Sequence, residues 1–186
     1  MGKIIVFNMV SVDGYFEGKN NDLTWHRVDK EVNDYFIREA ERADTILFGR
    51  KTYQLMESFW PTQKAIETDP GVAAIMNSYT KIVFSKTLEN ATWNNTLLIK
   101  EKPEEFVDRL KSKSTKDIMI FGSADLCQTL IQRGFIDEFR LMINPVVLGA
   151  GRTMFENIKL EFQLLKTRVF GNGNILCQYI KRDENY

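Results

Sequence analysis

Neither sign of charge is in excess along this chain, because 25 Lys and Arg residues are matched by 25 Asp and Glu residues. No overall field therefore attracts it to nucleic acid or to an anionic membrane, although the balance leaves room for a local basic site. Histidine occurs once, as His26, which excludes the common zinc sites built on several histidines. We expect no metal site, and neither nucleic acid nor a membrane as a partner.

Cysteine is scarce, and the hydrophobic runs are short. Cys127 and Cys177 lie far apart and form no metal-type spacing, so we expect two free, buried thiols in a reducing compartment. No apolar stretch reaches the roughly 20 residues of a membrane span, and the first residues lack the features of a signal peptide. These absences predict a cytoplasmic protein. The length of 186 residues favours a single domain, residues 1–186, with a full hydrophobic core.

Short apolar runs alternate with amphipathic segments along most of the chain. Strands are predicted at residues 3–10, 45–48, 81–85, 96–100, 117–121 and 138–148, with a hairpin of strands 163–170 and 174–181. Helices are predicted at about residues 29–43 and 51–59, and after Asp69-Pro70, Pro103 and Gly122-Ser123. This alternation predicts an α/β fold with a largely parallel central sheet, to which the hairpin adds an antiparallel strand.

The most informative motif is Gly49-Arg50-Lys51-Thr52, where a short apolar strand runs directly into a helix. Glycine permits a tight turn and the approach of a ligand, and the free N–H groups of a first helical turn favour an anion. Arg50 offers a planar fork of donors suited to a phosphate, and Lys51 adds a point charge. A plain turn with two solvated cations explains the pattern equally well, so spacing alone leaves both interpretations open.

Three further segments with polar side chains lie at the ends of predicted strands. Gly122-Ser123 repeats the strand–glycine–helix arrangement, and ligands gather at such places in parallel sheets; the alternative is helix capping by Ser123. Ser85-Lys86 places a hydroxyl and a cation at another strand end, where a surface loop is the favoured interpretation. Asp13 follows the first strand, either in a mobile loop over a ligand or in a turn where it bonds its own backbone.

In this order, the segments resemble a known family. They are Asp44-Thr-Ile-Leu-Phe-Gly-Arg-Lys-Thr-Tyr53, Phe84-Ser-Lys86, Ile120-Phe-Gly-Ser-Ala-Asp-Leu126 and Asn144-Pro-Val-Val-Leu-Gly-Ala-Gly151. The chain resembles the dihydrofolate-reductase-like superfamily, most closely the reductase domain of the bacterial bifunctional riboflavin-biosynthesis deaminase–reductase and its small stand-alone relatives. The resemblance covers about residues 3–181. It implies a three-layer α/β fold, with a mostly parallel central sheet flanked by helices and a C-terminal antiparallel hairpin.

The resemblance also implies a cofactor, NADPH, and a homodimer that acts on a small-molecule substrate. Arg50 matches the position that contacts the 2′-phosphate, which predicts NADPH over NADH. Asp13 lies in the segment that borders the reacting centre and is our candidate catalytic residue. Trp25, Asp29 and Glu57 are candidates for substrate binding. The implied cofactor-binding residues are Met9, Val10, Gly49, Arg50, Lys51, Thr52, Ser85, Lys86, Gly122, Ser123, Ala124 and Leu126.

This chain departs from the riboflavin enzymes at two places. Those enzymes usually carry a glutamate where this chain has Phe121, and an Asp-x-Pro where it has Glu57-Ser-Phe-Trp-Pro61. The substrate implied by the resemblance is 5-amino-6-(5-phosphoribosylamino)uracil, with hydride transfer to a C=N or C=O carbon. The departures keep two alternatives open: a dihydrofolate or pterin reductase, and a non-catalytic nucleotide-binding protein that kept the fold.

Overall fold

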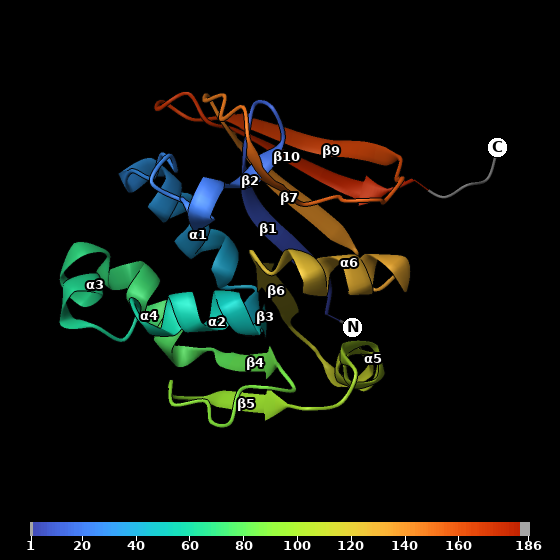
Figure 1. Cartoon of the computed structure of the whole chain (residues 1–186). Helices are drawn as coiled ribbons and strands as arrows, with labels where there is room; N and C mark the ends of the chain where they lie inside the picture. Colours follow the sequence, from blue (N-terminus) through green and yellow to red (C-terminus); the bar gives the residue numbers. More distant parts are fainter. Residues whose placement is uncertain (1, 183–186) are drawn as a thin grey trace.

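The computed structural model describes residues 2–182 and is built around an eight-stranded sheet (Figure 1). The strand order is β5-β4-β3-β6-β1-β7-β10-β9. All neighbours from β5 to β7 pair in parallel, whereas β10 pairs antiparallel with both β7 and β9. The strands are β1 (Ile4–Ser11), β3 (Ala43–Gly49), β4 (Thr80–Phe84), β5 (Thr96–Ile99), β6 (Asp117–Phe121), β7 (Glu138–Asn144), β9 (Phe162–Val169) and β10 (Ile175–Lys181). The predicted fold class is confirmed.

Helices cover both faces of this sheet (Figure 1). One face carries α1 (Lys30–Ala40), α2 (Arg50–Glu57), α3 (Gln63–Thr68) and α4 (Pro70–Ser78), and the other carries α5 (Pro103–Lys113) and α6 (Ala124–Gln132). Successive residues of β1 point to opposite faces, so Ile4 and Val6 join the core with α5 and α6, and Ile5 and Phe7 the core with α1 and α4. Within residues 2–182, no helix is long and apolar enough to cross a membrane.

Both cysteines are buried and free, as predicted. Cys127 lies on the inner face of α6, where burial raises the pKa of its thiol to about 12. The thiol is therefore protonated at neutral pH and acts as a small apolar core residue.

The structure corrects the predicted end of one strand. β7 ends at Asn144 rather than at residue 148, and Pro145, which follows, has no N–H group to donate to a neighbouring strand. Residues 145–150 instead form a loop against the segment after β1, where the Val12 N–H donates to the Val146 carbonyl at 2.9 Å.

Four short elements were not predicted from the sequence: β2 (Tyr15–Gly18), η1 (Lys19–Asn21), β8 (Gly151–Thr153) and the helix α3. β2 and β8 form a separate antiparallel pair, and η1 follows β2. These strands are too short to show a periodic pattern, and their pairing joins segments far apart in the sequence. The pair brings residue 152 beside the loop after β1.

The connections between strands define a switch point in the sheet. The chain leaves β3 through α2 toward β4, and it leaves β6 through α6 toward β7, in opposite directions along the strand order. In open parallel sheets, ligands bind where the connections diverge in this way, beyond the carboxyl ends of the strands. The two glycine-containing turns of the sequence follow these two strands.

Candidate functional site

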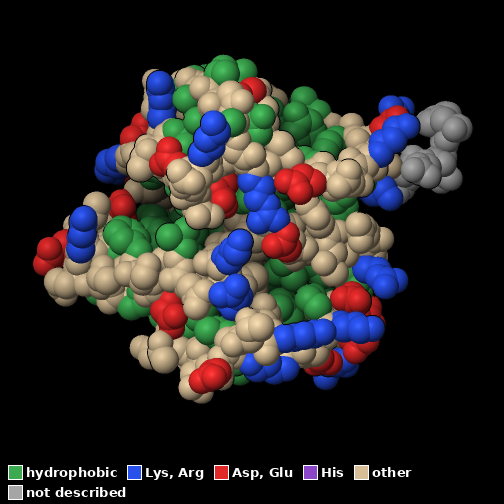
Figure 2. Space-filling view, in the orientation of Figure 1, with side chains coloured by type: hydrophobic (Ala, Val, Ile, Leu, Met, Phe, Trp, Pro, Cys, Tyr) green, Lys and Arg blue, Asp and Glu red, His purple; other side chains and the backbone are tan. Residues whose placement is uncertain are grey.

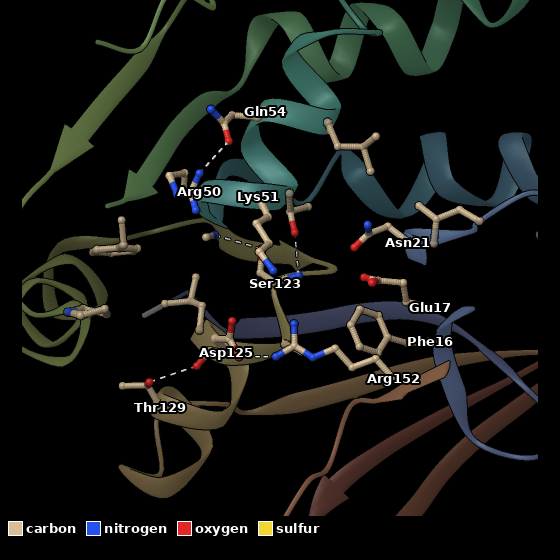
Figure 3. A pocket seen from close by; sticks show the side chains of 18 residues that line it. Phe16, Glu17, Asn21, Arg50, Lys51, Gln54, Ser123, Asp125, Thr129 and Arg152 are labelled. Atoms are coloured by element: carbon tan, nitrogen blue, oxygen red, sulfur yellow. Dashed lines mark hydrogen bonds and ion pairs between the residues drawn. The ribbon is translucent and has the colours of Figure 1, made fainter. Parts of the chain in front are cut away.

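A cleft of about 650 Å³ opens at the carboxyl ends of the parallel strands (Figure 3). Gly49 at the end of β3, Phe84 at the end of β4 and Ser123 after β6 all line it. In the space-filling view, Lys and Arg side chains gather in a column across the middle of this face (Figure 2). The cleft therefore lies at the switch point and beside a local basic surface.

Three helices begin at this cleft. Arg50, Pro103 and Ala124 are the first residues of α2, α5 and α6, and all three line it. Among the described residues, none caps these three helices with a side-chain hydrogen bond. The first N–H groups of a helix lack intrahelical partners and carry partial positive charge. Three such helix ends facing one space favour an anionic ligand.

Hydrogen bonds join the two glycine turns to each other. The Gly49 N–H donates to Ser123 Oγ at 3.0 Å, and the Ser123 N–H donates to Thr52 Oγ1 at 3.0 Å. Ser123 lies in the left-handed region (φ 54°) and its hydroxyl does not cap α6, so the capping interpretation is wrong. Gly122 is also left-handed (φ 56°), and a Cβ there would lie 3.0 Å from Thr52 Cγ2, so this position requires glycine.

Three cations line the cleft, and two of them have no carboxylate partner among residues 2–182. The Arg50 guanidinium donates to Gln54 Oε1 at 3.3 Å, and Lys51 has no hydrogen bond or ion pair to any residue between 2 and 182. The third cation, Arg152, forms an ion pair with Asp125. Sequence patterns could not identify Arg152, because only the pairing of β2 with β8 brings it to the cleft.

The remaining wall of the cleft is largely apolar. Its polar members include Glu17 on β2 and Asn21 on η1, the element that follows β2 (Figure 3). The apolar side chains are Phe16, Leu23, Leu55, Phe84, Pro103, Ala124 and Leu126. Apolar walls beside a few convergent polar groups are typical of sites for small molecules and cofactors.

The structure brings together seven of the predicted cofactor-binding residues. Gly49, Arg50, Lys51, Thr52, Ser123, Ala124 and Leu126 line the cleft. Five others do not line it: Met9, Val10, Ser85, Lys86 and Gly122. Val10 is buried in the core, and Ser85 Oγ accepts hydrogen bonds from the N–H groups of the turn that follows it.

The candidate substrate-binding residues lie outside the cleft lining and have other contacts. Asp29 caps α1 by accepting the Val32 N–H at 3.0 Å, and the Trp25 indole donates to the Asp22 carbonyl at 3.0 Å. Glu57 Oε1 accepts from the Tyr53 hydroxyl at 2.8 Å and from the Trp93 N–H at 2.9 Å.

Glu57 thereby holds the segment at residues 92–93 against the end of α2. Burial by itself would raise the pKa of the Glu57 carboxyl, but hydrogen bonds from Thr92 and Tyr53 outweigh it and lower the pKa. The carboxylate is therefore kept ionised for a structural contact.

Asp13, the candidate catalytic residue, connects two loops. Its carboxylate accepts from the Ser11 hydroxyl at 2.6 Å, the Leu148 N–H at 3.1 Å and the Gly149 N–H at 2.8 Å. The hydrogen bond from Ser11 is the main reason why the pKa of Asp13 is lowered. The carboxyl is ionised at neutral pH and cannot donate a proton there. A role as an ionised group near the reacting centre stays a prediction.

Comparison with known proteins agrees with this architecture. Residues 2–176 match the family model of the RibD C-terminal domain. The chain belongs to the RibD C-terminal domain family. It is 35% identical over 179 residues to the uncharacterized protein YyaP of Bacillus subtilis, covering 95% of this chain and 94% of that protein. It is 27% identical to YwjB of the same organism, with coverage of 96% and 98%.

Solved structures of RibD-like proteins share the fold. The chain is similar to a putative riboflavin biosynthesis protein from Shewanella (TM-score 0.74, 24% identity, covering 97% of this chain and 99% of that one). It is also similar to a pyrimidine reductase-like protein from Corynebacterium diphtheriae, with a TM-score of 0.68 and 14% identity, covering 98% of this chain and 93% of that one. The comparison with RibD from Acinetobacter baumannii gives a TM-score of 0.69 at 15% identity and covers 98% of this chain but 58% of that one. The family and the fold recognised in the sequence are confirmed.

Proposed function

We propose that this member of the RibD C-terminal domain family is an NADPH-dependent reductase. The observation that carries the proposal is the cleft at the switch point, where three uncapped helix N-termini and the cations Arg50 and Lys51 face one space. A dinucleotide carries a pyrophosphate, and NADPH adds a 2′-phosphate. Helix N-termini and arginine are the groups that proteins use to bind such phosphates.

Different residues of the cleft are proposed to bind the pyrophosphate and the 2′-phosphate of NADPH. Gly49 to Thr52 and Ser123 to Ala124, joined by hydrogen bonds, would hold the pyrophosphate at the starts of α2 and α6. Arg50 would bind the 2′-phosphate, since Gln54 is its sole described hydrogen-bond partner. Met9, Val10, Ser85, Lys86 and Gly122 stay in the proposed site on the strength of the sequence resemblance. The cofactor would supply the hydride, and the chain would supply binding, orientation and electrostatics.

The substrate proposed from the family is 5-amino-6-(5-phosphoribosylamino)uracil, reduced at a C=N or C=O carbon. Trp25, Asp29 and Glu57 have the contacts described above, and we do not assign them to this substrate. The segment Glu57-Ser-Phe-Trp-Pro61, which looks more like the dihydrofolate reductase sequence, keeps dihydrofolate or a pterin as the second candidate. Phe121 in place of an acid keeps a non-catalytic nucleotide-binding protein as a further alternative. Phe121 is buried, and its ring lies 6.2 Å from that of Phe7 and 5.5 Å from that of Phe36. Phe121 therefore packs in the core and supplies no carboxylate for a substrate.

A homodimer is also part of the proposal. Strand β9 forms an edge of the large sheet, and Leu164 and Val169 on it are 51% and 71% exposed. Edge strands with exposed apolar side chains are favourable surfaces for association. Sedimentation equilibrium tests this proposal; a monomer at all concentrations would exclude it.

Calorimetric titration with NADPH and with NADH tests the proposed cofactor. We expect both to bind and NADPH to bind more tightly, because it alone carries the 2′-phosphate. No heat of binding for either dinucleotide at concentrations on the order of millimolar would contradict the proposal.

Turnover then separates the candidate substrates. Oxidation of NADPH is followed by absorbance with the riboflavin intermediate and, separately, with dihydrofolate. Oxidation with the riboflavin intermediate supports the primary proposal. Tight NADPH binding without oxidation across a panel of carbonyl and imine substrates would favour a non-catalytic nucleotide-binding protein.

A further inference from the structure

The ion pair between Arg152 and Asp125 spans the cleft. Arg152 belongs to β8, and Asp125 is the second residue of α6. Figure 3 shows the Arg152 side chain reaching across the cleft toward Asp125. The guanidinium carbon also lies 6.0 Å from the centre of the Phe16 ring, and all three residues line the cleft.

Asp125 places a negative charge in the first turn of α6. This turn has no side-chain cap, and a helix N-terminus attracts anions. The carboxylate therefore lies near the helix end at which the proposed function places a phosphate. Arg152 is the cation that neutralises it.

The pair is also easy to separate. The side chain of Asp125 is 76% exposed and that of Arg152 is 29% exposed. Solvent-exposed ion pairs contribute little to stability, whereas arginine binds a phosphate through two parallel charge-assisted hydrogen bonds. The Phe16 ring can keep the guanidinium over the cleft while it changes partners.

We propose that Arg152 is a third anion-binding residue of the cleft, and that Asp125 takes the place of the pyrophosphate while the cleft is empty. When the dinucleotide binds, the Arg152 guanidinium releases the Asp125 carboxylate and binds phosphate oxygens instead. The unpaired Asp125 carboxylate then repels the negatively charged pyrophosphate. The inference rests on the proposed function. Asp125 therefore lowers the affinity for the dinucleotide, and Arg152 raises it.

The alternative is a purely structural contact that joins β8 to α6. The two explanations predict different signs for one substitution. If the contact is structural, Asp125→Asn loosens the cleft wall and leaves the affinity unchanged or weaker. If Arg152 exchanges partners, Asp125→Asn frees the guanidinium and removes the repulsion, so the affinity rises.

The test is calorimetric titration of Arg152→Gln and Asp125→Asn with NADPH and with NADH. Arg152→Gln should weaken both dinucleotides by about tenfold or more, because a charge-assisted contact to the shared pyrophosphate is lost. Asp125→Asn should tighten both by roughly threefold to tenfold. The ratio of the NADPH and NADH affinities should stay constant in both variants. Thermal denaturation checks that each variant is folded.

Arg42→Gln and Asp34→Asn are matched controls, because these exposed residues form ion pairs and do not line the cleft. Neither should change the affinity. Unchanged or weaker binding by folded Asp125→Asn would overturn the exchange while leaving the proposed cofactor intact. If the unmodified chain bound neither dinucleotide, the proposed function and this inference would both be overturned.

Discussion

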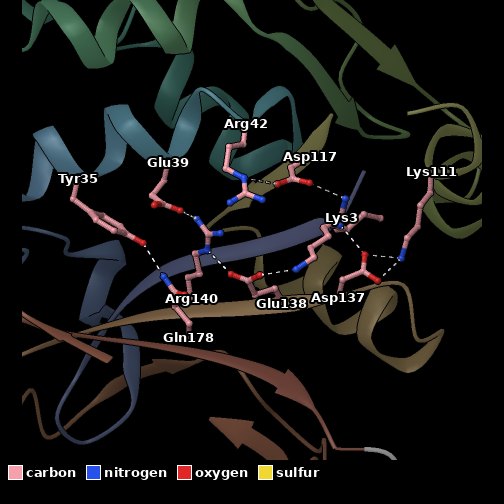
Figure 4. Close-up of polar contacts among 11 residues, drawn as sticks. Lys3, Tyr35, Glu39, Arg42, Lys111, Asp117, Asp137, Glu138, Arg140 and Gln178 are labelled. Carbon is pink, nitrogen blue, oxygen red and sulfur yellow. Dashed lines mark hydrogen bonds and ion pairs between the residues drawn. The ribbon is translucent and has the colours of Figure 1, made fainter. Parts of the chain in front are cut away.

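The two ends of the parallel sheet use charge in different ways. At the amino end, cations are paired with carboxylates of the chain itself (Figure 4). Arg140 contacts Glu138 at 2.6 Å and Glu39 at 2.8 Å, and the Lys111 and Asp137 side chains lie 2.6 Å apart. At the carboxyl end, Arg50 and Lys51 have no carboxylate partner among residues 2–182.

Burial explains the difference. The side chains of Arg140 and Glu138 are each 6% exposed, and a buried charge without a partner is costly. In the cleft, Arg50 and Lys51 are exposed and remain hydrated without a carboxylate partner among residues 2–182, and the pair of Arg152 with Asp125 is itself partly exposed. The amino end is therefore a structural network, whereas the carboxyl end keeps its cations available to a ligand. Substitutions at the amino end should change stability, and those in the cleft should change binding.

The largest effect is expected from Glu138→Gln at the amino end. This change leaves buried Arg140 with a single carboxylate and should lower the free energy of unfolding by about 3 kcal/mol. Urea denaturation measures it, and the folded variant should bind NADPH normally. Glu101→Gln removes the exposed partner of Arg109 and should cost less than about 1 kcal/mol. Equal costs for the two variants would contradict the structural importance of the buried network.

Arg50→Ala should produce the next largest effect, at the carboxyl end. The loss of one charge-assisted contact should weaken NADPH by about 1.5–3 kcal/mol, with NADH much less affected. Calorimetry measures both affinities, and unfolding in urea should be unchanged. Arg42→Ala removes an exposed arginine at the amino end and should leave both affinities intact. Equal losses of NADPH and NADH with Arg50→Ala would remove Arg50 from its proposed role.

His26 should make stability depend on pH. Burial lowers the pKa of its imidazole to about 4, against a weaker opposing effect of Asp22, and its buried Nε2 has no partner among the described residues. Since the unfolded pKa is near 6.5, the unfolded chain binds more protons between these values, and stability falls as the pH drops from about 6.5 to 4. A shift of this size corresponds to about 3 kcal/mol. Because His26 is only partly buried and solvent screens it, the loss should be on the order of 2 kcal/mol.

Urea denaturation across this pH range, compared with His26→Gln, isolates the contribution of the imidazole. The variant should lose less stability on acidification than the unmodified chain. Parallel pH profiles of stability for the two proteins would show that unfolding does not change the protonation of His26.

The smallest effect is expected at the link between the two glycine turns. Thr52→Val removes the acceptor of the Ser123 N–H and should cost about 1 kcal/mol of stability. Thr52→Ser keeps the hydroxyl and should cost less. If valine and serine were equivalent in urea denaturation, this hydrogen bond would contribute nothing measurable to the stability of the link between the two turns.

The sequence predicted the large sheet well, because its signals are local. The apolar runs of β1, β3 and β6, the glycine that ends β3 and the glycine that follows β6 lie within a few residues of the structure they determine. The β2–β8 pair was missed because it depends on contacts between segments more than 130 residues apart. Arg152 was missed for the same reason.

The roles of the carboxylates were harder to predict. Residue type alone does not show which N–H groups a carboxylate accepts from. Glu57 is bonded to Trp93, and Asp13 to Leu148 and Gly149, through contacts that exist only in the folded chain. Asp29 is the local case, since it stands at the start of the helix predicted from residue 29 and caps α1 by accepting the Val32 N–H.

A crystal structure with NADPH tests the central claim most directly. The account predicts the pyrophosphate within hydrogen-bond distance of the first N–H groups of α2 and α6, and the 2′-phosphate on Arg50. It also predicts that the Arg152 guanidinium has left Asp125 for the pyrophosphate. A dinucleotide bound outside this cleft, or one bound in it with its 2′-phosphate away from Arg50, would contradict the account.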